Sequence, residues 1–409
     1  MRGFKKFFVV IFLLLFVVSG SWASGRINSS NGLLRVNAAW VLPPRHLTFF
    51  SHTDFFGKAV EVDETTAKAF WQVNVLANFT YGLNQHFEIG VSPIVYQDNH
   101  KSGKGYNLPS DLYVNIKAGN YGSKASSITF GILGQMRFPT GTDHNLAFEP
   151  YSAPTFGWGF TGLLSYSLDP LYPEDEFNAH LNLGYFNHND VGERLTQLPT
   201  EEDSIFVKAT TQEFLYGFGI RLPGRQVDYG LEFFGNAFLQ APPVTAYSRE
   251  NYLYISPSIT YRPNRWCTFV FSFDYRLTSD KDETEYELLT PGPFAGKDMP
   301  NYPTWKINAG IKLQLLPTSV YRVDERDILM QKAESRRELF EQIIRERRQT
   351  ESAEEELERI KDERRKAERE LERLRKILED QARRRQELER LKDQLPEPKK
   401  EDEEPPPQE

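Results

Sequence analysis

The chain contains very little cysteine. Cys267 is the single cysteine among 409 residues, so an intrachain disulfide and a thiolate metal cluster are both excluded. Its neighbours are apolar and strand-forming, which favours a buried or lipid-facing thiol over a reactive one. The formal net charge of −8 argues against nucleic acid as a partner. We therefore expect no metal site, no cofactor and no nucleic-acid partner.

Long hydrophobic runs are equally scarce. The run from Phe7 to Val18 follows three basic residues and precedes a stretch of mostly small residues, Ser19 to Gly25. This order is typical of a signal peptide, which we expect over 1–24. The alternative is a transmembrane anchor, but about a dozen apolar residues fall short of the roughly 20 that a spanning helix needs. If the mature chain crosses a membrane, it must therefore do so as a β-barrel.

Catalytic motifs are missing as well. The sequence has no HExxH motif and no nucleophile elbow, and its seven histidines have no serine or aspartate companion at a convincing spacing. His180 and His188 are expected to be lumen or surface residues. An outer-membrane lipase is the enzyme alternative that we weighed. Because no residues support it, we expect no catalytic site and no enzyme activity.

The sequence does contain a period-two alternation of apolar and polar residues, repeated about a dozen times between Gly32 and Pro317. Gln72–Tyr81, Asp111–Ala118 and Trp305–Leu315 are the clearest runs. Strict alternation indicates a β-strand with one apolar and one polar face. Aromatic residues make up 13% of the chain, which suits a β protein.

Three observations favour a transmembrane antiparallel β-barrel over a soluble β-sandwich, which would also alternate. The expected strands have about ten residues, as a tilted membrane crossing needs. Aromatic side chains gather toward the strand ends, as they do in interfacial girdles. Charged residues lie in mid-strand, where they would be costly in a sandwich core but can line a wet lumen, and opposite charges on neighbouring strands should pair. These lumen-lining candidates are Glu88, Lys117, Arg137, Glu213, Arg221, Glu232, Asp274 and Lys306.

Connection lengths give the barrel a direction. From the strand that starts at Ala69 onward, short connections such as Gly82–Gln85 alternate with long ones such as Pro139–Pro154. Bacterial barrels have short periplasmic turns and longer outer loops. About twelve strands, from roughly His46–Phe55 to Pro303–Leu316, therefore place both ends of the barrel in the periplasm.

One strand-like segment, Leu33–Leu42, does not fit this count. A thirteenth strand would break the even parity of a bacterial barrel. Pro43 and Pro44 would also end any strand pairing at this point. We expect the segment to be an inner plug or wall segment of a barrel domain that covers 25–317.

The last quarter of the chain changes its period from two to three and four. An apolar stripe at heptad spacing, with acid-before-base pairs four residues apart, predicts a charged helical rod over 318–395. Its length would be about 100 Å at 1.5 Å per residue. Polar residues at core positions, such as Thr350 and Arg364, leave a lone helix and a weak coiled coil as alternatives. We favour self-association, or packing on a periplasmic or cell-wall partner, through 325–395. The proline- and acid-rich tail, 396–409, is expected to be disordered.

Three runs of the expected barrel resemble a known family. Tyr81–Pro93, Ser110–Lys117 and Gln135–Gly141 are similar to the hairpin, strand and Pro-Thr-Gly loop that recur in this order in outer-membrane proteins of the phenol-degradation meta-pathway or transporter-like type. The match is close from Phe70 to Gly141 and general elsewhere. This chain departs from the family pattern at Ser110, where glycine is usual, and in its charged C-terminal extension. The resemblance implies a membrane barrel and a role in passing small hydrophobic molecules.

Two functions of different classes follow from these observations. The leading hypothesis is a pore or transporter for small solutes in the outer membrane of a diderm bacterium, surrounded by outer-membrane lipid and carrying a periplasmic rod. The alternative is a structural envelope protein, whose barrel anchors a rod that tethers the membrane to the cell wall or to a periplasmic partner.

Overall fold

The computed structural model describes residues 31–63, 66–100, 104–122, 126–195, 206–285, 300–318 and 325–393. Thirteen strands and one long helix lie in these ranges. The strands are β1 (Leu47–Asp63), β2 (Thr66–Gly82), β3 (Phe87–His100), β4 (Lys104–Asn107), β5 (Leu112–Tyr121), β6 (Ile128–Phe138), β7 (Gly157–Ser167), β8 (Asn178–Asn187), β9 (Gln212–Leu222), β10 (Val227–Gln240), β11 (Tyr252–Tyr261), β12 (Cys267–Arg276) and β13 (Trp305–Leu316), and the helix is α2 (Glu325–Asp393).

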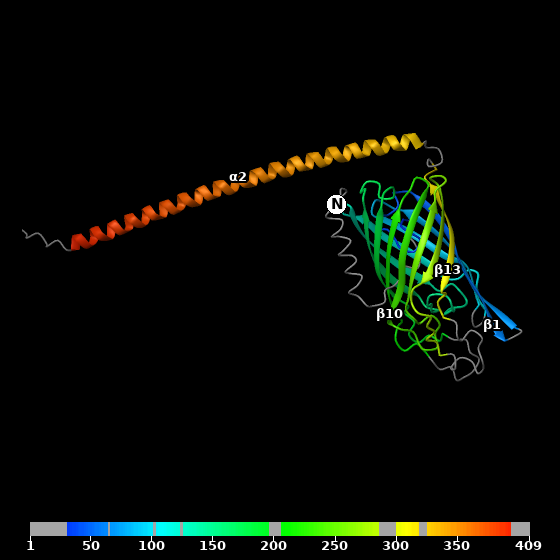
Figure 1. The fold of residues 1–409 in the computed structure, drawn as a ribbon. Helices are drawn as coiled ribbons and strands as arrows, with labels where there is room; N and C mark the ends of the chain where they lie inside the picture. Colours follow the sequence, from blue (N-terminus) through cyan, green and yellow to red (C-terminus); the bar gives the residue numbers. More distant parts are fainter. Residues whose placement is uncertain are drawn as a thin grey trace, which may run out of the picture. The chain divides into compact units, whose positions relative to one another are not determined.

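Twelve of the strands close into an antiparallel β-barrel, shown in Figure 1. Each strand pairs with its neighbour in the chain, and β1 closes the barrel by pairing with β13. The short strand β4 pairs only with the end of β3 and is not one of the twelve. The barrel fold and the strand number expected from the alternation are therefore confirmed.

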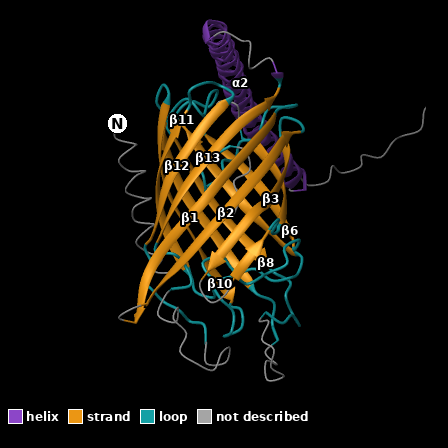
Figure 2. Ribbon diagram, turned by 90° about the vertical axis from the view of Figure 1, so that its right-hand side faces the viewer, coloured by secondary structure: helices purple, strands orange, loops and turns teal. Residues whose placement is uncertain are grey.

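The hairpin of β1 and β2 is longer than the sequence suggested. The expected first strand ended at Phe55, whereas β1 and β2 have 17 residues each and stay paired from Leu47–Tyr81 to Asp63–Thr66. The pairing of β1 with β13 ends at Phe55. The remainder of the hairpin therefore projects beyond the barrel wall, as the two side views in Figures 1 and 2 show.

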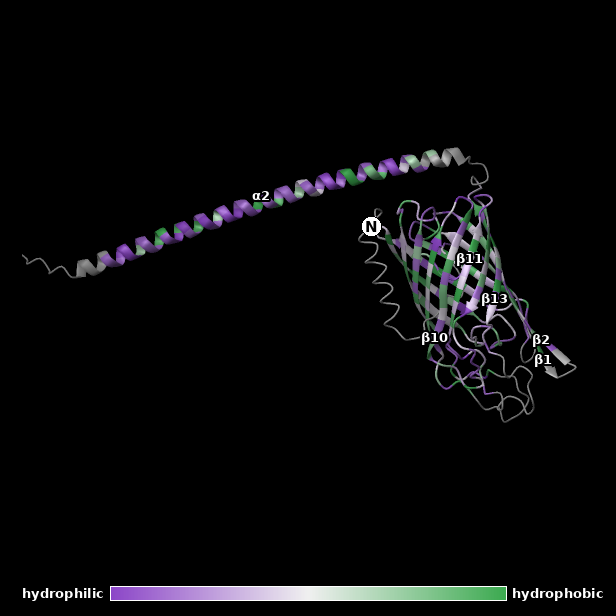
Figure 3. Ribbon diagram, viewed as in Figure 1, coloured by the Kyte–Doolittle hydropathy of each residue, from purple (hydrophilic) through white to green (hydrophobic). Residues whose placement is uncertain are grey.

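The barrel has a polar interior and an apolar outer wall. Phe79 is 44% exposed, while its neighbours Asn78 and Thr80 are each 1% exposed. The same alternation runs along the other strands (Figure 3), where Ile116 and Ile307 face outward and Asn115 and Asn308 are buried. A soluble β-sandwich would show the reverse arrangement, so the sandwich alternative is wrong. Such an outer wall has the composition of a lipid-facing surface.

The helix α2 is a separate unit of the structure, because the chain divides between Val323 and Asp324. It is one continuous helix of 69 residues, as the three-and-four periodicity predicted. Glutamate, arginine and lysine dominate it, so most of it is coloured as hydrophilic in Figure 3. No helix among the described residues is long and apolar enough to span a bilayer. The expected signal peptide, 1–24, and the expected disordered tail, 396–409, lie outside the described residues.

Candidate functional site in the barrel lumen

The N-terminal segment 31–42, called the plug below, lies inside the barrel. Every residue of the plug except Gly32 is buried. The backbone N–H groups of Arg35 and Val36 donate to Glu232 Oε1 at 2.7 and 2.8 Å, and that of Leu42 donates to Glu88 Oε2 at 2.7 Å. Because a buried backbone donor needs a partner, strand side chains take the place of a neighbouring strand here. The expected inner plug is confirmed.

Arg35 fixes the plug to the opposite side of the barrel. Its Nη2 donates to Asp54 at 3.0 Å, to Asp274 at 3.2 Å and to Asn308 at 3.0 Å, which belong to β1, β12 and β13. The guanidinium carbon lies 5.5 Å from the ring centroid of Phe234. A buried cation is tolerated only with such compensation, so two carboxylates and one amide oxygen hold this side chain in place.

Glu88 and Lys117 form an ion pair between β3 and β5. Lys117 Nζ lies 2.9 Å from Glu88 Oε1, and both side chains are almost completely buried. The lysine also donates to the carbonyl oxygen of Ala38 in the plug at 3.3 Å. The expected pairing of opposite charges on neighbouring strands is confirmed here, and the pair holds the plug as well as the wall.

The other predicted lumen residues are buried beside polar or aromatic partners, with one exception. Glu213 accepts from His188 at 2.8 Å, and Lys306 Nζ lies 5.8 Å from the ring centroid of Tyr254. The exception is Arg221, whose side chain is 13% exposed and pairs with Asp228 at 2.6 Å. Burial alone does not show that these eight residues line a solute path, which stays a prediction.

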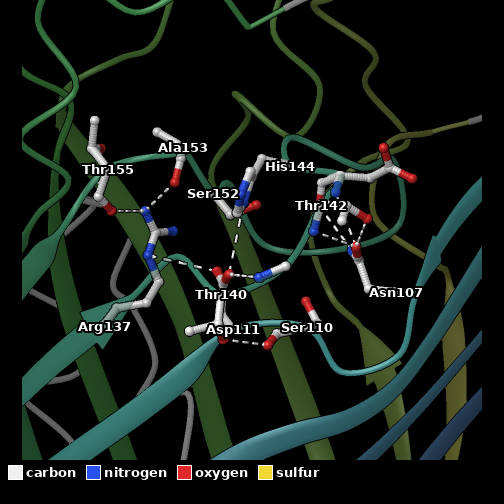
Figure 4. Close-up of polar contacts among 12 residues, drawn as sticks. Asn107, Ser110, Asp111, Arg137, Thr140, Thr142, His144, Ser152, Ala153 and Thr155 are labelled. Atoms are coloured by element: carbon white, nitrogen blue, oxygen red, sulfur yellow. Dashed lines mark hydrogen bonds and ion pairs between the residues drawn. The ribbon is translucent and has the colours of Figure 1, made fainter.

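A second inward segment was not expected from the sequence. Residues 139–156, called the inner loop below, connect β6 to β7 and are anchored near the start of the loop (Figure 4). Asn107 Oδ1 accepts from Thr142 N, Thr142 Oγ1 and Asp143 N, each at 2.9 Å. Thr140 Oγ1 donates to the carbonyl oxygen of Ser110 at 2.7 Å. Four hydrogen bonds therefore tie the start of the loop to the β4–β5 connection.

Arg137 and Asp111 hold the same loop at both ends. Arg137 Nε lies 3.8 Å from Asp111 Oδ2, and Arg137 Nη2 donates to the carbonyl oxygens of Ala153 at 2.7 Å and Thr155 at 3.2 Å (Figure 4). Asp111 Oδ1 also accepts from Gly141 N at 3.4 Å. Asp111, Arg137 and Gly141 all belong to the runs that carry the family resemblance. The density of polar residues in those runs was the available signal for this anchor.

The tip of the inner loop is buried inside the barrel. Phe148 is completely buried and packs edge-to-face on Phe56, with ring centroids 5.3 Å apart. Glu149 Oε1 accepts from Gln72 Nε2 at 2.5 Å, from Asn99 Nδ2 at 3.2 Å and from the Asn74 amide. Burial raises the pKa of the Glu149 carboxyl above its ordinary value, and the three amide donors oppose part of that rise.

Between the plug and the inner loop lies a cavity of about 100 Å³. Its boundary is formed by Arg35 of the plug, by Glu149, Pro150 and Ser152 of the inner loop, and by the strands around them. Polar groups and aromatic rings are mixed in the strand lining, which comprises His52, Asp54, Asn74, Leu76, Ile94, Gln97, Ser110, Asp111, Tyr113, Phe234, Tyr252, Tyr254, Asp274, Tyr302 and Lys306. Such a lining can hold a small molecule that has both an apolar body and a polar group. No cluster of histidine, cysteine or acidic side chains among the described residues is arranged to hold a metal ion.

One arrangement inside the barrel resembles a hydrolase triad in its connectivity. Ser165 Oγ lies 2.8 Å from His180 Nδ1, and His180 Nε2 lies 3.0 Å from Asn178 Oδ1. However, Ser165 Oγ accepts a hydrogen bond from Ala39 N of the plug at 2.8 Å, and Trp40 packs edge-to-face on His180 at 5.0 Å. The serine is completely buried and its oxygen is engaged, so these residues hold the plug rather than present a nucleophile.

No protein-family model matches the chain, and no curated protein matches it. Solved structures that match include an outer membrane channel from Pseudomonas putida F1, with 8% identity, a TM-score of 0.41, and coverage of 68% of this chain and 98% of the other. They also include the NanC porin, with 8% identity, a TM-score of 0.39, and coverage of 65% and 100%. The Pseudomonas putida toluene transporter TodX follows, with 10% identity, a TM-score of 0.33, and coverage of 67% and 90%.

These matches are likenesses of barrel architecture at very low identity. They do not test the resemblance to the phenol-degradation type, which stays a prediction. The function of this chain has to follow from its own residues.

Proposed function

We propose that the chain is an outer-membrane channel for small solutes, and that its solute path runs through the cavity between the plug and the inner loop. The observation that carries this proposal is the cavity itself, enclosed in a polar lumen by two segments that are not part of the wall. A barrel that served only as an anchor would have no use for such a cavity.

Passage through the barrel requires at least one of the two inner segments to move. Both are held mainly by hydrogen bonds and ion pairs to wall side chains, such as those of Glu232 and Asn107. Water can replace polar contacts of this kind at low net cost, whereas apolar packing cannot be replaced in that way. The aromatic part of the lining favours solutes with an apolar body, in line with the family resemblance.

The connections support an orientation with both barrel ends in the periplasm. Short turns, such as 83–86 and 223–226, lie on one rim, and the long connections 139–156 and 188–211 lie on the other. Short turns face the periplasm in bacterial barrels. On this proposal the plug enters from the periplasmic side, and α2 follows β13 into the periplasm.

Replacing Asn107 by alanine should loosen the inner loop and increase ion conductance. The substitution removes one acceptor of three hydrogen bonds, each worth about 1 kcal/mol net. The measurement is single-channel current in planar lipid bilayers, with protease cleavage within 139–156 as a second readout. Asn115→Ala is the matched control, because Asn115 is also buried in the wall but bonds to Ser92 and Gln135 instead of the loop.

The wild-type chain should give small currents in the same experiment, and N107A larger ones. A complete lack of conductance and of solute flux, for the wild type and for N107A in every condition, would reject the channel proposal. Equal currents for N107A and N115A would instead reject the inner loop as a barrier.

The tethering function remains a second candidate because of α2. The helix has 69 residues, and apolar side chains such as Ile360 and Leu371 are 65% and 60% exposed on it. A pore needs no such rod, whereas a tether needs one that reaches a partner.

Deleting Glu325–Glu409 distinguishes the two functions. We expect solute flux to persist, because every anchor of the plug and the inner loop lies within the barrel unit. Flux assays in proteoliposomes and detergent sensitivity of intact cells are the two measurements. Loss of envelope integrity with intact flux favours tethering, and loss of flux with an intact envelope shows that transport requires the rod.

A further inference from the structure

The apolar stripe of α2 follows a heptad repeat whose flanking charges point to a specific partner. Leu357, Ile360, Leu371, Leu374 and Leu378 lie at the core positions of this repeat and are 53–65% exposed. With Leu357 and Leu371 at position a, Ile360 and Leu374 fall at position d. Core residues of a coiled coil are exposed in this way only in a helix considered without its partner.

The ion pairs within α2 are concentrated on the opposite face. Arg337–Glu341, Arg345–Glu341, Arg365–Asp362 and Lys376–Glu372 all join residues at positions b, c and f of the repeat. These positions face solvent in a coiled coil. By contrast, four charged residues beside the stripe form no ion pair with another described residue, and these are Glu356, Lys361, Glu370 and Arg375.

These four residues complement one another across a parallel pair of helices. Glu356 and Glu370 lie at position g, and Lys361 and Arg375 lie at position e of the following heptads. In a parallel, in-register dimer each g residue lies beside the e residue five positions later in the other helix. Glu356 then meets Lys361 of the second copy, and Glu370 meets Arg375. An antiparallel pair would bring g positions together, and therefore glutamate beside glutamate.

The polar core position Arg364 fits the same arrangement. Its Nε lies 2.9 Å from Glu368 Oε1, which neutralises the glutamate at position e. Without this contact, Glu363 at position g would repel Glu368 of the second copy. In-register pairing also places Arg364 opposite its own equivalent instead of opposite a leucine, and a polar residue at position a is known to fix register.

We propose that α2 forms a parallel, in-register coiled coil with the α2 of a second copy of this chain. The pairing covers Ala353–Leu378, where the core is apolar except at Arg364. Two barrels inserted in the same direction deliver both helices to the same side of the membrane, which also requires parallel pairing. This inference does not depend on whether the barrel conducts solutes.

Disulfide trapping of the full chain tests the proposal. In a Cys267→Ser background, Leu371→Cys at position a should give a covalent dimer on mild oxidation, because a parallel in-register pair brings position 371 next to itself. Arg373→Cys at position c is the control and should remain monomeric. A monomer for both variants, or equal dimer yields, would overturn the proposal.

Charge reversal then tests the orientation. In the Leu371→Cys background, Glu370→Lys should reduce the dimer yield several-fold, because it places lysine beside Arg375 of the second copy. Adding Arg375→Glu should restore the yield. Equal yields for the single and double variants would contradict the parallel g–e pairing, and circular dichroism of each variant checks that the helix itself is retained.

Discussion

Replacing the plug residues 33–42 by a glycine–serine segment of equal length should increase the ion conductance of the barrel more than any single substitution. The plug fills the lumen with side chains that are all buried. Its removal leaves Asp54 and Asp274 without Arg35, and Glu232 without its two shortest backbone donors. The resulting pore should therefore conduct more current and prefer cations. Single-channel current and reversal potential in a salt gradient measure both effects.

The effect on stability should be smaller than the number of broken contacts suggests. A carboxylate that loses its partner in a dry site costs about 3–5 kcal/mol, but water entering the emptied lumen would solvate these groups. We therefore expect the variant to remain folded. A folded variant with wild-type conductance would show that the plug is not a barrier.

The second large effect is expected for the Glu88–Lys117 pair. Lys117→Glu places two buried carboxylates side by side and should destabilise the barrel by about 3–5 kcal/mol or more. The double variant E88K/K117E restores the opposite charges and should recover most of the barrel's stability. Unfolding in urea, followed by the heat-sensitive gel mobility of the barrel, measures the free energy.

The double variant should not recover the plug contacts. Glu88 accepts from Leu42 N, and Lys117 donates to the carbonyl oxygen of Ala38, and neither bond survives the exchange. Conductance should therefore stay above that of the wild type. Lys376→Glu on α2 is the matched control, because its ion pair with Glu372 at 3.3 Å is exposed and such pairs contribute at most about 1 kcal/mol. An equal loss of stability for K117E and K376E would contradict this account.

The wall of the barrel could be predicted from sequence because a strand's two faces alternate residue by residue. The exposed Phe79 beside the buried Asn78 and Thr80 is one example of a pattern that needs no knowledge of distant residues. The plug was also predictable, since a strand-like segment before Pro43 and Pro44 exceeded an even strand count. The paired charges Glu88 and Lys117 followed from their place in mid-strand.

The inner loop and the long hairpin could not be predicted in the same way. The inner loop has the polar composition of a solvent-exposed loop, and its anchor at Asn107 lies 35 residues before Thr142. Nothing in a short window of sequence reports such a contact. In the hairpin, the consecutive aromatics Phe55 and Phe56 followed by Gly57 interrupt the alternation, although the strands continue through them.

The central claim is that solutes cross the barrel only when the plug moves, and a disulfide lock tests it most directly. A Cβ atom built on Gly219 of β9 would lie 3.3 Å from Val36 Cβ, close to the 3.5–4.5 Å that a disulfide needs. In a Cys267→Ser background, the Val36→Cys/Gly219→Cys variant should block solute flux into proteoliposomes when oxidised and restore it when reduced. Flux that is the same in the oxidised and reduced states, with the disulfide shown to have formed, would contradict the claim.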